Sequence, residues 1–404
     1  MSGLHLFKKS VHACGVVLDV GSMSVAAGLY VTNPRGDVNL LYATRERIHF
    51  QKKLTGEALF SAMCTALDTT LLHLEKYGME RSMREGGKSY VVDTVSVTLS
   101  SPWHASEMKT LKKRLEKETV ITEAIVNELI TDEEQSFERR LTAKEAELLH
   151  QPAPLERKII EMSLNGYPSG NPYGKRASTL EVKVFESMSS SLLIKKIKRS
   201  VGKYFPVEAV VFHSFSMTAF ASIRDQFPHI DNFLIVQVDG EITDITIVKK
   251  GVVAEMVSFP FGHNNIVRAL SVVCDNYPNC TLEGLLSLHT SKVINSRDKK
   301  RVDEAVSNAK KEWLDKFNSA IASFSEQMFL PKTVFIFEDI PHTSLFEEFL
   351  KKAESSQFTI TAEPFTVLKL FNQSPSLAKP DSNDHDTTVL TMEAHFANSC
   401  SRKP

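Results

Sequence analysis

Residues 15–30 constrain the fold most strongly, because they combine an apolar strand, a tight polar loop and a second strand. Residues 16–18 form a β-branched-rich apolar run that is typical of a covered strand. Asp19 then places a carboxylate at the end of this strand, and Gly21 and Ser22 follow in a loop whose glycine permits a tight turn. Such a loop can direct backbone N–H groups and a hydroxyl toward a phosphate, while the carboxylate holds a hydrated metal ion. The same short motif also fits an ordinary hairpin with a polar tip, because such motifs recur by chance.

A second stretch, residues 234–248, repeats this organisation far downstream. With Gln237 laid over Asp19, it again gives an apolar strand, a short polar loop and a strand of alternating pattern. Two hairpins of this kind resemble the nucleotide clamp of the actin and sugar-kinase architecture, in which they lie on opposite lobes and face each other across a cleft. The repeat strengthens the phosphate-binding interpretation of the first loop.

Composition limits the classes of protein that the chain can belong to. Its 404 residues suggest two or three domains if a domain has about 150 residues. A formal net charge of −1 gives no reason to expect a nucleic-acid partner. Five cysteines without a Cys-x-x-Cys spacing indicate reduced thiols in a cytoplasm. No stretch approaches the ~20 apolar residues of a membrane-spanning helix, and no apolar core of a signal peptide is evident.

The order of elements along the chain adds further constraints. An apolar stripe at helical spacing predicts a helix over 55–77. The segment 101–187 reads as an insertion, with strand-like residues over 155–164 and an alternating strand over 180–185. Between these two strands, residues 171–174 read Asn-Pro-Tyr-Gly, which is the composition of a turn.

The two loops and the order of elements in the insertion resemble the bacterial relatives of actin. The likeness is closest to the FtsA cell-division family, whose Asn-Pro-Ile-Gly turn is similar to residues 171–174, and the pilus-assembly relative PilM comes second. This resemblance implies an α/β, actin-like (ribonuclease H-like) two-lobed ATPase fold with an α+β subdomain inserted in the first lobe.

The resemblance also implies where the domains begin and end. The first lobe would be formed by residues 1–100 and 188–229, and the subdomain inserted into it by residues 101–187. The second lobe, with a short insertion, would cover residues 230–372. Residues 373–404 would form a linker and a C-terminal tail.

The resemblance further implies that the cleft binds ATP and Mg²⁺. The residues that it assigns to the nucleotide are Asp19, Gly21, Ser22, Met23, Gly240, Thr243, Asp244 and Gly262. Asp19 would also hold Mg²⁺ through a water molecule, and Asp244 is the candidate catalytic residue.

Several positions depart from the family pattern and put nucleotide binding in doubt. Gln237 stands in place of the leading carboxylate of the second loop, and Asp239 and Glu241 stand in place of small residues. Their negative charge would repel a triphosphate unless metal ions compensate. Aligning Asp239 as the leading carboxylate instead leaves the loop two residues short. Glu338 and Asp339 replace glycines under the adenosine, where the backbone must approach closely. We therefore expect ATP binding to be weakened or lost.

Two neighbouring segments depart from the pattern as well. Residues 258–264 resemble a Ser-x-Pro-x-Gly-Gly-Asn segment, but His263 replaces the second glycine, and we interpret it as a helix cap or surface residue. Residues 281–289 occupy the place of a helix that carries a lysine against the base, and no lysine stands at the matching position.

The resemblance implies a cytoplasmic scaffold of bacterial cell division that acts through contacts with other proteins. These would be an FtsZ-like partner at the septum, other division or envelope proteins, or further copies of the chain. A PilM-like scaffold of pilus or secretion assembly and an active actin-type ATPase remain as alternatives. The basic and apolar residues 4–9 and the tail 387–404 predict at most weak contact with the inner face of the cell membrane.

Overall fold

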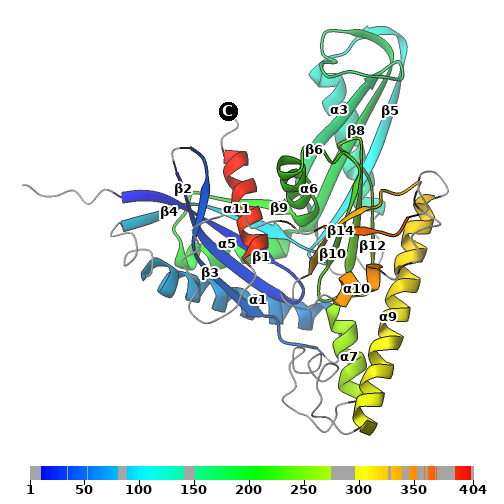
Figure 1. Cartoon of the computed structure of the whole chain (residues 1–404). Helices are drawn as coiled ribbons and strands as arrows, with labels where there is room; N and C mark the ends of the chain where they lie inside the picture. The colour runs from blue at the N-terminus through cyan, green and yellow to red at the C-terminus, as the bar shows by residue number, and fades with distance from the viewer. Residues whose placement is uncertain are drawn as a thin grey trace, which may run out of the picture.

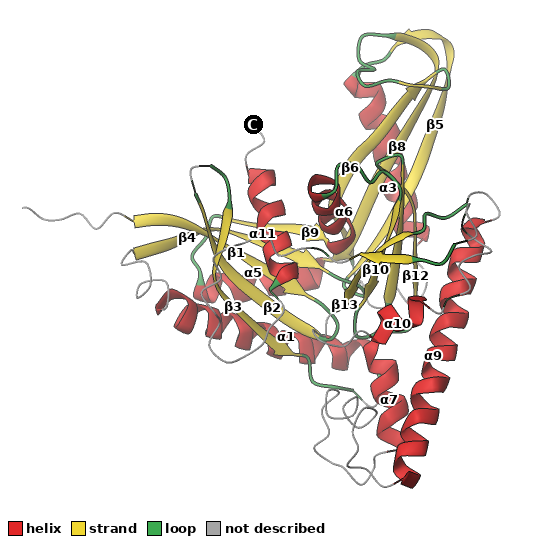
Figure 2. Ribbon diagram, viewed as in Figure 1, coloured by secondary structure: helices red, strands yellow, loops and turns green. Residues whose placement is uncertain are grey.

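The part of the chain that the computed structural model describes forms three β-sheets, two of which share one topology (Figures 1 and 2). This part comprises residues 11–33, 35–51, 53–80, 89–140, 151–273, 296–325, 329–338, 345–351, 353, 359, 363–368, 370 and 387–401.

The first sheet contains the hairpin that the sequence predicts over 15–30. Its strands, in spatial order, are β3 Val38–Arg47, β2 Ser24–Thr32, β1 Val11–Val20, β4 Ser89–Leu99 and β9 Ala209–Ser214. The strands β3, β2 and β1 are mutually antiparallel, whereas β1, β4 and β9 are parallel. The loop between β1 and β2 therefore leaves the sheet from its central strand.

The second sheet repeats this arrangement. Its strands, in spatial order, are β12 Val252–Phe259, β11 Thr243–Lys249, β10 Phe233–Val238, β13 Thr333–Glu338 and β14 Thr366–Leu368. Here β12, β11 and β10 are antiparallel, and β10, β13 and β14 are parallel. The loop between β10 and β11 thus holds the same place in its sheet as the loop between β1 and β2.

Helices cover both faces of the first sheet. On one face, α1 Gly56–His73, its π-helical continuation η1 Leu74–Gly78 and α5 Ser191–Tyr204 share a hydrophobic core with the strands. Thr55 caps the N-terminus of α1, so the helix predicted over 55–77 is confirmed. On the other face lies α11 Thr388–Ser401, which packs beside α6 Phe215–Gln226.

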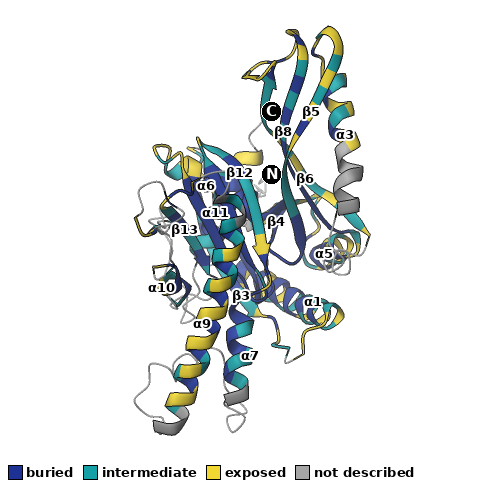
Figure 3. Cartoon of the chain, turned by 90° about the vertical axis from the view of Figure 1, so that its right-hand side faces the viewer, coloured by how far each residue is buried: buried dark blue, intermediate teal, exposed yellow. Residues whose placement is uncertain are grey.

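The second sheet is covered by α7 His263–Val273, α9 Ser296–Ser325 and α10 Leu345–Lys351. Trp313 and Phe317 of α9 are fully buried in this core and stack on each other with ring centroids 5.0 Å apart. The paired helices α7 and α9 extend beyond the sheet (Figure 1), and the outer side of α9 is exposed (Figure 3).

The third sheet falls between residues 104 and 190, within and just beyond the predicted insertion. Its strands, in spatial order, are β5 His104–Val120, β8 Arg176–Ser190, β6 Pro152–Leu164 and β7 Tyr167–Pro168. The helix α3 Glu123–Arg140 packs on one face of this sheet, which projects away from the other two (Figure 1). The turn at residues 171–174 is present, and Gly174 has a φ of 79°, which favours glycine.

The C-terminal segment differs from the linker and tail that the sequence suggests. In the structure, α11 buries Leu390, Ala394 and Ala397 against Val17 and Tyr30 of the first sheet. These apolar side chains contact protein, so in this arrangement they are withdrawn from a membrane surface. The expected linker and the basic stretch at residues 4–9 lie outside the described residues. Within the described part of the chain, no helix combines the length and apolar character needed to cross a membrane.

Candidate functional site

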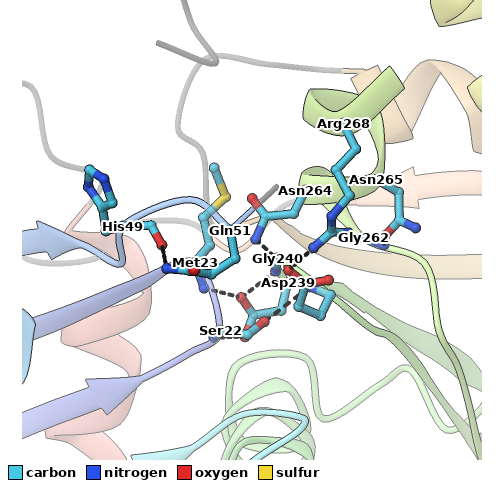
Figure 4. Close-up of polar contacts among 11 residues, drawn as sticks. Ser22, Met23, His49, Gln51, Asp239, Gly240, Gly262, Asn264, Asn265 and Arg268 are labelled. Carbon is cyan, nitrogen blue, oxygen red and sulfur yellow. Dashed lines mark hydrogen bonds and ion pairs between the residues drawn. The ribbon is translucent and has the colours of Figure 1, made fainter. Parts of the chain in front are cut away.

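The tips of the two hairpins meet where the first and second sheets adjoin (Figure 4). The tip between β1 and β2 carries Ser22 and Met23, and the tip between β10 and β11 carries Asp239 and Glu241. The predicted phosphate loops therefore do face each other. They are in direct contact.

The carboxylate of Asp239 lies against the backbone of the first loop. Its Oδ2 accepts a hydrogen bond from the N–H of Ser22 over 2.9 Å, and its Oδ1 accepts from the N–H of Met23 over 3.2 Å. The N–H of Gly240 also donates to Oδ1, over 2.6 Å. Asp239 is 3% exposed. The N–H groups that the sequence pattern directs at a phosphate are thus bound to a side chain of the protein itself.

Other contacts join the two halves beside this carboxylate. The N–H of Glu241 donates to Oγ of Ser22 over 3.1 Å. The side-chain amide of Gln237 donates to Oγ of Ser100 over 2.7 Å, so the residue that replaces the family carboxylate bonds to a neutral hydroxyl. The side chain of Met23, 7% exposed, packs into the core of the second sheet, although Met23 belongs to the first loop.

Two of the glycines assigned to the nucleotide allow close approach between parts of the protein. A Cβ atom on Gly262 would lie 2.2 Å from the carbonyl oxygen of Asp239, and one on Gly240 would lie 3.0 Å from the backbone of Ser22. The first distance is shorter than real contacts and the second is tighter than most of them, so a larger residue at either position would push the second loop away from its neighbours.

The charge of Glu241 is compensated by the start of α7. Its Oε1 accepts hydrogen bonds from Nδ2 of Asn264 over 2.9 Å and from Nη2 of Arg268 over 2.6 Å. The guanidinium of Arg268 also lies over the ring of Phe50, 5.8 Å from its centroid. Glu241 therefore ties the second loop to α7, a role that the loop pattern alone did not indicate.

Thr243 is engaged within the second half, and Asp244 contacts a residue of each half. The hydroxyl of Thr243 donates to the carbonyl oxygen of Phe261 over 2.6 Å and accepts from Nε1 of Trp313 over 3.0 Å. Asp244 accepts a hydrogen bond from Ser258. Burial raises the pKa of Asp244 to about 6, against the opposing effect of hydrogen bonds from Ser258 and Ser101.

Asp19, the predicted magnesium residue, lies in a buried charged cluster. It is 8% exposed, and its Oδ2 is 3.8 Å from Nη2 of Arg45. Glu393 of α11 is an unexpected neighbour of Asp19. The pKa of Glu393 is raised well above its usual value, mainly by burial and in second place by the negative charge of Asp19. Nothing in the local sequence around Glu393 pointed to this position, because the contact depends on the return of α11 to the first sheet.

His263 is buried and is the first residue of α7, so its expected place on the surface is wrong. Its N–H donates to the carbonyl oxygen of Asp239 over 2.9 Å, and its Nε2 lies 3.6 Å from Oε2 of Glu338. Its ring packs edge-on against Phe346, with centroids 4.8 Å apart. Glu338, one of the residues expected to replace a glycine, thus lies against a buried histidine. Asp339 and the segment 281–289 lie outside the described residues.

The residues present do not fit ATP and Mg²⁺ in this arrangement. The cavity beside the two loops, which Asp19, Gln237, Asp239 and Glu338 help to line, has a volume of about 30 Å³. Small-molecule pockets have volumes of roughly 300–1,000 Å³, and a cavity of this size holds one or two waters at most.

A larger cavity of about 350 Å³ lies on another side of the second loop, between the starts of α1 and α7. Its walls are mixed, with apolar residues such as Leu54, Leu59 and Pro260 and the polar residues Thr55, Glu241, Asn265 and Arg268. Ser22 and Met23 do not line it. A phosphate group in this cavity would therefore be separated from the loop amides.

Comparison with known proteins shows the fold. No protein-family model matches the sequence, and no curated protein matches it. Among solved structures, PilM in the PilM-PilN type IV pilus biogenesis complex aligns over 96% of this chain and 99% of that chain, with a TM-score of 0.59 and 11% identity. The MamK double helical filament covers 97% of this chain and 100% of that chain at a TM-score of 0.44 and 9% identity. The ethanolamine utilization protein EutJ from Carboxydothermus hydrogenoformans aligns over 95% of this chain and 89% of that chain, with a TM-score of 0.41 and 11% identity. The chain has the actin-like ATPase fold, as the two hairpins predicted.

Proposed function

We propose that the protein is an actin-fold scaffold of the PilM kind, which works in the assembly of a bacterial envelope structure through protein–protein contacts and does not turn over ATP. The observation that carries this proposal is the direct contact between the two loops, which leaves a cavity of about 30 Å³ where a nucleotide would lie. Fold alone does not establish catalysis. A scaffold role needs only the surface of the fold.

The likeness to PilM favours pilus or secretion assembly over other scaffold roles. It extends over nearly the whole of both chains, with a TM-score of 0.59. Since that structure is a complex of PilM with PilN, the corresponding partner of this chain would be a PilN-like membrane protein, and the protein would lie at the inner face of the membrane through that partner.

An FtsA-like role in cell division is the second candidate. It is favoured by the turn at residues 171–174, which lies between β7 and β8 in the third sheet and resembles the turn of FtsA. On this candidate the partner would be an FtsZ-like protein.

A pull-down with two peptides separates the candidates. The PilM-like role predicts that the purified protein binds the cytoplasmic N-terminal peptide of a PilN-like partner and does not bind an FtsZ C-terminal tail. The reverse result would favour the division role. Binding of neither peptide would contradict both roles.

The absence of turnover is tested separately. We expect the wild-type protein to hydrolyse Mg-ATP no faster than an Asp19→Asn variant, because the loop amides already bind Asp239. Robust hydrolysis that Asp19→Asn abolishes would instead identify an active actin-type ATPase.

A further inference from the structure

The contacts of Asp239 have the geometry of a bound anion. Three backbone N–H groups converge on its carboxylate: Ser22 and Met23 from the first loop at 2.9 and 3.2 Å, and Gly240 from the second at 2.6 Å. Successive backbone N–H groups in a turn form concave sites for anions, and hydrogen bonds to an ionised acceptor are stronger than neutral ones. The acceptor comes from one half of the protein and two of the donors from the other.

We propose that Asp239 is a built-in anion: its carboxylate occupies the anion site of the first loop and so holds the two halves together without a bound ligand. Once that carboxylate is removed, the backbone N–H groups that it occupied can bind a small oxyanion in its place. This inference goes beyond the scaffold role and does not depend on which partner the scaffold binds.

The first loop is shaped to fit this carboxylate. A Cβ atom on Gly21 would lie 2.8 Å from Oδ2 and 3.1 Å from Oδ1 of Asp239, so only glycine leaves room for the side chain. The φ of Gly21 is not in the left-handed region that would by itself require glycine. The absence of a side chain at this position is therefore explained by the approach of Asp239.

The charges around the site favour one carboxylate over a polyphosphate. Asp19, Glu338 and Arg45 line the adjoining cavity, with Arg45 beside Asp19, and Glu241 is paired with Arg268. A group with several negative charges would meet the repulsion of Asp19 and Glu338, against one positive charge from Arg45, in a poorly solvated place. A single carboxylate carries only one negative charge, and it still accepts hydrogen bonds from all three N–H groups.

Chemical rescue tests the site directly. Asp239→Gly removes the carboxylate and leaves a space of its size, and the probe is sodium formate, compared with sodium chloride at equal ionic strength. Formate should raise the melting temperature of Asp239→Gly, because a ligand that binds only the native state stabilises it. The melting temperatures of the wild type and of Asp239→Asn, whose side chains still fill the space, should not rise. An equal rise in all three proteins, or no rise in Asp239→Gly, would overturn the proposal.

A double-mutant cycle tests the same contact without an added ligand, and remains informative if Asp239→Gly is too unstable for rescue. Gly21→Ala should lower the melting temperature clearly more than the control Gly170→Ala, because no atom lies within 4 Å of a Cβ on Gly170. In an Asp239→Ala or Asp239→Gly background, which lacks the carboxylate atoms that the new Cβ would meet, the loss caused by Gly21→Ala should shrink. If Gly21→Ala costs no more than Gly170→Ala, the carboxylate does not occupy the loop. Such a result would leave the peptide-binding test of the scaffold role unaffected.

Discussion

The side-chain amide of Gln237 donates a hydrogen bond to Oγ of Ser100 over 2.7 Å and joins the central strand of the second sheet to the end of β4 in the first. Gln237 is 8% exposed and Ser100 is 2% exposed, so water does not replace either group readily. This contact, together with that of Asp239, closes the boundary between the two halves by means of the protein's own side chains.

Replacing Gln237 by alanine should therefore destabilise the protein. The change removes the amide of Gln237, so the buried hydroxyl of Ser100 loses its hydrogen-bond donor. This loss should lower the unfolding free energy by about 1–3 kcal/mol. Denaturation in urea measures the loss. The matched control is Gln51→Ala, whose amide donates to the carbonyl oxygen of His49 at an exposed position, and this change should cost about 0.5 kcal/mol or less. Equal losses in the two variants would show that the contact with Ser100 is not stabilising.

Asp244 should make the protein less stable as the pH rises through 6. Burial raises its pKa from 3.8 to about 6 in the folded state, so the folded protein binds the proton more tightly than the unfolded chain. The stabilising contribution is complete below pH 3.8 and is lost as the pH rises toward and through 6. A difference of two pKa units corresponds to about 3 kcal/mol. Asp244→Asn removes the titration, so its stability relative to the wild type should increase between pH 4 and pH 8. A constant difference over this range would contradict the assignment.

Glu156 should show the opposite dependence on pH. Burial raises its pKa, but contacts with His213, Lys158 and Ser214 outweigh burial and lower the pKa below 4.5. Its carboxylate accepts hydrogen bonds from the N–H and hydroxyl of Ser214, and so attaches β6 of the third sheet to the start of α6. The stabilisation is present above pH 4.5 and is lost as the pH falls through the lowered pKa.

Glu156→Gln should accordingly cost about 1–3 kcal/mol at pH 7 and less in acid. Urea denaturation at pH 7 and at pH 3 measures both values. A surface control is Glu181→Gln, since the side chain of Glu181 is 33% exposed and pairs only with the exposed Lys112 among the ion pairs of the described residues. This control should change stability by about 1 kcal/mol or less. If Glu156→Gln lowers the stability at pH 7 no more than Glu181→Gln does, the proposed role of Glu156 is contradicted.

The helix α11 should behave as an integral element of the first half. Leu390 is 2% exposed and packs in a cluster with Val17 and Leu40. Leu390→Ala should cost about 2–5 kcal/mol, because it removes buried methyl groups and leaves a cavity. Ser399→Ala, at an exposed position of the same helix, is the control and should have little effect. If α11 served mainly as a membrane anchor, Leu390→Ala would instead weaken binding to anionic vesicles and leave stability unchanged.

Local patterns in the sequence were sufficient to predict the fold, but they could not predict the contacts that the two loops make with each other. The β-branched strand before Asp19 and its counterpart before Asp239 carry the hairpin signal in adjacent residues, and α1 shows a regular apolar stripe. The loop pattern also indicated that Asp239 is an obstacle to a triphosphate. The pattern could not reveal that the carboxylate of Asp239 accepts hydrogen bonds from the N–H groups of Ser22 and Met23. These residues are 217 and 216 positions away from Asp239 in the sequence.

The positions of Met23 and Glu393 were unpredictable for the same reason. Met23 reads as a loop residue beside a phosphate, yet its side chain enters the core of the second sheet. Glu393 reads as a residue of a polar tail, yet α11 brings it beside Asp19. The placement of Met23 depends on how the two halves meet, and that of Glu393 depends on the return of α11 to the first sheet. No local pattern encodes either contact.

Thermal melting of the wild-type protein with and without millimolar Mg-ATP tests the central claim most directly. A ligand that binds the native state must raise its melting temperature. Because Asp239 already satisfies the amides of the first loop, we predict the same melting temperature in both conditions. A clear rise with Mg-ATP, absent with Mg²⁺ alone, would show that the cleft accepts nucleotide and would contradict this account.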